Sequence, residues 1–166
     1  MQTPRNALIE DQPCDSLAQI AQALAGLADH LSKRADLEHE TGQAKTAEVF
    51  DGLCHHACLI KEAVEFEAVR LHEKHHEFDF AAWVQNFPAQ FPTALGHEHP
   101  YRNPFIRCEQ RETYDAVRSG FQFLEEVIPS ISLSPAGKLG HCRIMECLSG
   151  AMAFEAKCRG RTASVP

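Results

Sequence analysis

The chain has 166 residues, a formal net charge of −7 with histidine neutral, and a composition that is 44% hydrophobic and 23% charged. This length suits one domain with a single core, and the acidic balance argues against general affinity for nucleic acid or an anionic membrane, since both require a basic surface. No apolar run approaches the roughly 20 residues that a membrane-spanning helix needs. Residues 1–14 also lack the apolar core of a signal peptide. We therefore expect a cytoplasmic globular protein that binds neither nucleic acid nor membrane.

Cysteine and histidine are the two residue types that stand out. The chain has seven cysteines, an odd number, and no CxxC pair. A disulfide framework or a zinc ribbon would require paired spacings, so we expect reduced thiols. The ten histidines are the first place to look for metal ligands.

The first helix is predicted at about 16–40, after a frayed lead-in over residues 1–14. Ser16 and Gln19 have the spacing of a capping box, and Gly42 marks the break after the helix. The apolar residues recur at intervals of three and four, as on one face of a helix. They are Leu17, Ile20, Leu24, Leu27 or Ala28, Leu31 and Ala35.

The second helix is predicted at about 44–77, with one apolar stripe. The stripe consists of Val49, Leu53, Ala57, Ile60, Val64, Ala68 and Leu71. The following segment, 78–104, is rich in aromatic residues and prolines. Its spacing predicts a short helix near 79–87, and the rest is expected to be a crossover that packs against the bundle.

The third helix is predicted at about 105–128 and is ended by Pro129. A fourth helix follows at about 135–158, because Ser134 and Pro135 form an N-cap with proline at the first helical position. A flexible tail, 159–166, completes the chain. The residues expected to face inward are Ile106, Val117, Phe121, Leu124 and Ile128 on the third helix, and Leu139, Ile144, Leu148, Ala151 or Met152, and Cys158 on the fourth.

No segment has the alternating pattern of a β-strand. The prediction is therefore an all-α fold, a four-helix bundle in a single domain over residues 1–158, with a long crossover between the second and third helices.

Residues 23–63 resemble the first helix pair of the rubrerythrin-type branch of the ferritin-like superfamily. The matching features are Ala28, Leu31 and Ala35 on the first helix, Gly42 in the turn, and Ala47 with Phe50 at the start of the second helix. Residues 99–156 resemble the second pair more weakly. The resemblance implies a ferritin-like bundle. In that family, glutamates and Glu-x-x-His motifs hold a di-iron centre.

The family's ligands are mostly absent from this chain. The resemblance places the ligand positions of the first half at Leu24, Ala57 and Ile60, none of which can bind a metal. In the second half, Glu112 and Glu146 fall near ligand positions, with Ser149 where histidine is expected. The expected function is therefore a non-catalytic ferritin-like module that has lost its di-iron site. It would act by oligomerisation, as a dimer, or by binding a protein partner.

A metal-binding protein or oxidoreductase is the first alternative. His72 and His76 are four residues apart on the second helix, so they point the same way and can share an ion such as iron or zinc. The remaining candidates share carboxylate or imidazole chemistry and are Glu65, Glu73, His97 and His99. The same spacing is also typical of a solvated helix face with charged pairs, and His97 and His99 fit an ordinary surface loop.

A thiol redox protein is the second alternative. Cys54 and Cys58 share one helix face, and His55 and His56 lie between them. A charged imidazole beside a cysteine lowers the pKa of the thiol and makes it reactive. Buried cysteines also serve simply as small hydrophobic residues.

Overall fold

The computed structural model describes residues 6–73, 103–107, 109–131 and 135–162, with the side chains of 72–73, 135–136 and 159–162 left out. These residues form four α-helices and one short 3-10 helix, with no strand among them. The elements are α1 (Pro13–Glu40), α2 (Ala44–Glu73), α4 (Gln110–Val127), η2 (Ile128–Ser130) and α5 (Pro135–Thr162). The predicted all-α, four-helix architecture is confirmed. The predicted crossover, including its short helix at 79–87, lies outside the described residues except for 103 and 104.

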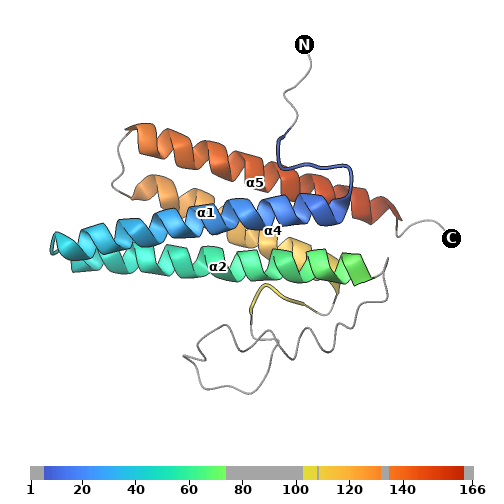
Figure 1. Cartoon of the computed structure of the whole chain (residues 1–166), viewed down its shortest axis with the longest axis horizontal. Helices are drawn as coiled ribbons and strands as arrows, with labels where there is room; N and C mark the ends of the chain where they lie inside the picture. Colours follow the sequence, from blue (N-terminus) through green and yellow to red (C-terminus); the bar gives the residue numbers. More distant parts are fainter. Residues whose placement is uncertain (1–5, 74–102, 108, 132–134, 163–166) are drawn as a thin grey trace, which may run out of the picture.

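The four helices form two antiparallel hairpins laid side by side (Figure 1). Helix α1 packs on α2 and α4 packs on α5, while α2 also contacts α4 and α1 also contacts α5. The turn of the first hairpin uses Gly42, whose φ of 76° is the left-handed conformation that glycine adopts most easily. No helix of the described part is long and apolar enough to cross a membrane.

Helix α1 packs with the face that its sequence predicts. Every residue of the predicted stripe is at most 6% exposed, because the three- and four-residue intervals follow the helical period. The buried members are Leu17, Ile20, Leu24, Leu27, Ala28, Leu31 and Ala35.

The stripe predicted for α2 is correct in its middle and wrong at its start. Val49 is 45% exposed, whereas Phe50, the next residue, is 1% exposed and fills the core position. Ala68 is half-buried and packs against the core rather than within it. One step along a helix turns the side chain by about 100°, which is enough to exchange core for solvent.

The start of α4 at Gln110 corrects the predicted start at 105. Asn103 Oδ1 accepts a hydrogen bond from the amide of Phe105 (2.9 Å), and Thr113 Oγ1 accepts one from the amide of Arg107 (3.0 Å). These bonds hold the preceding residues in turns. Of the predicted inward residues, Val117, Phe121, Leu124 and Ile128 are buried, and Ile106 is half-buried.

The inward face predicted for α5 is wrong on its N-terminal half. Leu139 and Ile144 are 55% and 42% exposed, and Cys158 is exposed as well. Helix α5 begins at Pro135 as predicted and ends at Thr162, four residues beyond the predicted end. The residues that face the core are His141, Met145, Leu148, Ala151, Met152 and Glu155.

The N-terminal lead-in is more ordered than its sequence indicates. Helix α1 begins at Pro13, so Ser16 lies inside the helix and is not its cap. The hydroxyl of Ser16 instead accepts a hydrogen bond from the amide of Glu10 (2.9 Å). The side-chain amide of Asn6 donates to the carbonyl of Cys147 on α5 (2.7 Å). Residues 6–12 are therefore tied to the bundle rather than frayed.

Candidate functional site

The predicted His/Glu metal site can be traced only in part. His72 and Glu73 are the last residues of α2, with their side chains outside the described part, as are His76, His97 and His99. The described member, Glu65, is half-buried and pairs with Lys61 at 2.7 Å. The metal site of the first alternative therefore remains a prediction.

The ferritin-like ligand positions of the first half are filled by buried apolar side chains. Leu24, Ala57 and Ile60 are each 0% exposed and belong to one core cluster. A close-packed apolar interior offers no lone pairs to an iron ion and no space for its water ligands.

The two glutamates at the ligand positions of the second half are far apart. Glu112 is exposed in the first turn of α4 and Glu146 is exposed on α5. Ser149 of α5 donates a hydrogen bond to Glu125, and the two helices are antiparallel, so Glu146 lies level with the end of α4. Glu112 lies at the opposite end of that helix, about 24 Å away at 1.5 Å per residue.

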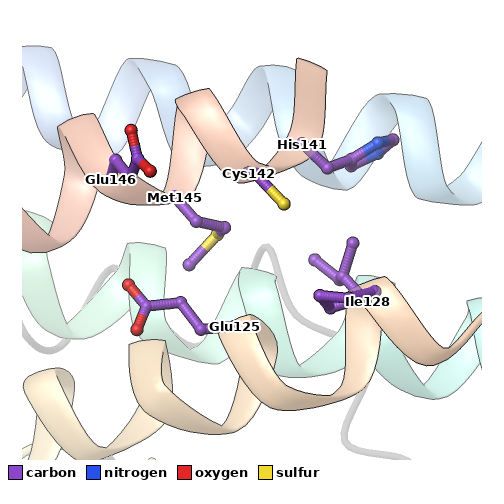
Figure 2. A pocket seen from close by; sticks show the side chains of 7 residues that line it. Glu125, Ile128, His141, Cys142, Met145 and Glu146 are labelled. Atoms are coloured by element: carbon purple, nitrogen blue, oxygen red, sulfur yellow. The ribbon is translucent and has the colours of Figure 1, made fainter. Parts of the chain in front are cut away.

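A surface pocket of about 270 Å³ lies between α4 and α5. Its walls carry Glu125, Ile128, Pro129, His141, Cys142, Met145 and Glu146. In Figure 2, Cys142 and Met145 point into the gap, whereas the ring of His141 points along α5, away from Glu125 and Glu146. The pocket therefore exposes two carboxylates and a thiol to solvent without focusing them on one point.

The Cys54 thiol of the second alternative is suppressed rather than activated. Burial, followed by the neighbouring Cys58, raises the pKa of Cys54 to about 11, and its Sγ donates to the carbonyl of Ala28 (3.3 Å). At neutral pH this cysteine is a thiol, and thiols are poor nucleophiles.

The imidazole of His56 does not lower the pKa of the Cys54 thiol. Its Nε2–H donates to the carbonyl of Gly120 (3.2 Å), and its ring packs against Phe105 and Phe123, with centroids 5.2 and 4.6 Å away. Burial holds the pKa of His56 below its ordinary value, so the ring is neutral at pH 7 and supplies no positive charge.

Two fully buried carboxylates are features that the sequence analysis missed. Glu67 is 0% exposed and Glu155 is 1% exposed. Glu67 follows Val64 by three residues and precedes Leu71 by four, so it occupies a core position of the α2 stripe. Glu155 occupies the equivalent position after Met152 on α5. The available signal in the sequence is a glutamate at the position where an apolar stripe would continue.

These carboxylates lie towards the same end of the bundle. Cys54 contacts Ala28 and His141 contacts His30. Helices α2 and α5 both run antiparallel to α1 (Figure 1). Counting residues along them from these two contacts places Glu67 and Glu155 level with the first turn of α1. Tyr114 on α4 is also buried, at 2% exposed. Arg70 Nη1 lies 3.1 Å from Glu67 Oε1 and compensates its charge.

No protein-family model, curated protein or solved structure matches the chain. Among the side chains that the structure describes, no group of three or more His, Cys, Asp or Glu could hold a metal ion.

Proposed function

We propose that the chain is a non-catalytic helical module of ferritin-like type, without a di-iron centre, that acts by self-association. The observation that carries the proposal is the complete burial of Leu24, Ala57 and Ile60 in an apolar core. Two iron ions are held in this type of bundle by four carboxylates and two histidines that project inward, and three of those six positions here can supply no ligand. A bundle of this kind retains its packing and its surfaces as its functional parts.

A surface aromatic strip, defined as His56, Phe105 and Phe123, supports association as the function. Phe123 is 46% exposed, and its ring lies against His56, which also contacts Phe105. Exposed aromatic rings that are already ordered lose little conformational freedom on binding, which favours their use in protein contacts. The strip lies where α2 and α4 meet, so a second copy packed there would cover both hairpins.

The first experiment tests the absence of the di-iron centre. The reduced protein is loaded with ferrous iron without oxygen, exchanged into metal-free buffer and analysed for iron. We expect substantially less than two iron atoms per chain. Two tightly retained irons per chain would overturn the proposal. A smaller amount of retained iron that His72→Ala/His76→Ala removes would favour the alternative site on α2 instead.

The second experiment tests self-association by light scattering after size-exclusion chromatography. The expected mass is about twice the 18.5 kDa of one chain. Phe123→Ser is expected to shift the protein towards the monomer. Phe154→Ser is the matched control, since Phe154 on α5 is 45% exposed. A wild-type protein that stays monomeric at every concentration would contradict self-association, and an equal response of both variants would contradict the aromatic strip.

A further inference from the structure

Two histidines from different hairpins meet at the interface between α1 and α5. The ring centroids of His30 and His141 are 5.0 Å apart, with 51° between the ring planes. His141 is 6% exposed, whereas His30 lies at the surface. An ion from solvent can therefore reach the pair from the side of His30, while the burial of His141 restricts the movement of its ring.

The hydrogen bonding of His141 leaves one ring nitrogen free to bind a ligand. Its Nδ1 lies 2.7 Å from the carbonyl oxygen of Gly137. A carbonyl can only accept, so Nδ1 carries the proton and the lone pair of the neutral ring is on Nε2. Histidines that bind metals are oriented in this way, with the second nitrogen donating to a backbone carbonyl or a carboxylate.

The separation of the two rings matches that of two imidazoles on one ion. A metal–nitrogen distance of about 2.0–2.1 Å places each ring centroid about 3.2 Å from the metal. Ligand angles between about 90° and 109° then give centroid separations of about 4.5–5.2 Å. The observed 5.0 Å lies within that interval, so a shared ion requires little movement of either helix.

The charges around the pair are compatible with a dication. Partial burial, followed by the nearby His141, lowers the pKa of His30, and a lowered pKa favours the neutral ring that a metal requires. Two cations of α1 near His30 are each engaged by a carboxylate. Lys33 pairs with Asp29 at 2.6 Å, and Arg34 pairs with Glu38 at 2.6 Å.

We propose that His30 and His141 form a two-histidine site for a borderline divalent transition-metal ion such as Ni²⁺ or Zn²⁺, which joins α1 to α5. Water fills the remaining coordination positions, and imidazole suits these ions. The site is separate from the helix α2 candidates and from the apolar core that carries the proposed function. Its consequence is a bundle whose first and last helices are clamped when the ion is bound.

The test uses Ni²⁺, because it favours imidazole over the carboxylates nearby. The full chain is titrated calorimetrically at pH 7.5, and its melting temperature is followed in parallel. His30→Gln removes one ligand at the surface, and His39→Gln is the matched control on the same helix. His141→Gln is the second ligand variant, but because His141 is buried the substitution has to be checked for folding by circular dichroism.

We expect Ni²⁺ to raise the melting temperature of the wild type and of His39→Gln. His30→Gln is expected to lose one binding event and most of this rise, with affinity at the site falling roughly tenfold or more. Unchanged stoichiometry, affinity and melting shift in His30→Gln would overturn the two-histidine site. That result is distinct from failure of the proposed function, which shows itself as two irons per chain or a persistent monomer.

Discussion

The pKa of the half-buried Glu62 is subject to two opposing effects, burial and a hydrogen bond. It lies on α2, and the side-chain amide of Asn103 donates to its Oε2 (3.0 Å) and to the carbonyl of Leu59 (2.5 Å). Burial raises the pKa of Glu62, and the bond from Asn103, which acts in the opposite direction, offsets only part of that effect.

Glu62→Gln should therefore change the dependence of stability on pH. The raised pKa means that the folded protein holds this proton more tightly than the unfolded chain. The contribution of Glu62 to stability is thus greatest when it is protonated, and it declines as the pH rises from about 4.5 through the folded pKa. We expect the free energy of unfolding of Glu62→Gln, measured by urea denaturation, to increase relative to that of the wild type as the pH rises from 4.5 to 7.

The exposed Glu126→Gln on α4 reports the general effect of removing one negative charge in the same measurement. If the difference in the free energy of unfolding between Glu62→Gln and wild type stays constant over this pH range, the pKa of Glu62 is not raised in the folded protein.

Cys54 gives a second prediction at the scale of one residue. With a pKa of about 11 instead of 9.0, its thiolate fraction at neutral pH is roughly 100-fold smaller than that of an ordinary thiol. Alkylation of Cys54 by iodoacetamide should be correspondingly slow and should accelerate steeply towards pH 11. Peptide mass spectrometry can follow it against the exposed Cys142, Cys147 and Cys158 in the same sample. Equal rates at neutral pH would restore the thiol redox alternative.

Helices α2 and α4 approach closely at Gly120. A Cβ at this position would lie 2.8 Å from Phe105 Cε1 and 2.9 Å from Ile60 Cδ1, closer than packed carbons allow. The absence of a side chain thus permits the contact between the two hairpins. It also leaves the carbonyl of Gly120 within reach of His56.

Two glycine substitutions separate this packing effect from helix propensity. Gly26→Ala on α1 meets nothing within 4 Å, so it should raise the free energy of unfolding by about 0.5–1 kcal/mol. Gly120→Ala gains the same propensity but overpacks the interface at a cost of about 1–3 kcal/mol, so the net result should be a loss of about 1 kcal/mol. Chemical denaturation measures both. A Gly120→Ala protein as stable as Gly26→Ala would show that the hairpins separate without penalty.

The four helices differ in how well their sequences predict their faces. Helix α1 has all of its large apolar residues except Leu37 on one face, so its core follows directly from their spacing. Helix α5 has large apolar residues, Leu139 and Ile144, outside the core and polar ones, His141 and Glu155, inside it. Periodicity cannot distinguish the two sets, because the burial of a polar group is decided by partners on other helices. The start of α4 is set in the same way, by side-chain bonds that compete with the helix.

At the scale of the whole molecule, helix order and number could be predicted because each hydrophobic period is local to its segment. The candidate sites could not, since they depend on how the helices are registered against one another. His30 and His141 meet only because α1 and α5 are neighbours in the bundle, and the buried Glu67 and Glu155 share one end for the same reason. The metal site and the reactive thiols predicted on α2 rest on spacing within that one helix, which carries no information about the residues of neighbouring helices.

The hydrogen bond from Asn6 to Cys147 spans 141 positions of the chain. During synthesis on the ribosome the residue that donates it emerges early, and the carbonyl that accepts it emerges only after most of α5 has been made. The α1–α2 hairpin can form as soon as its own residues have left the ribosome, but this N-terminal latch closes last. The last step of folding should therefore be the docking of α5 against residues 6–12, which forms the hydrogen bond between Asn6 and Cys147.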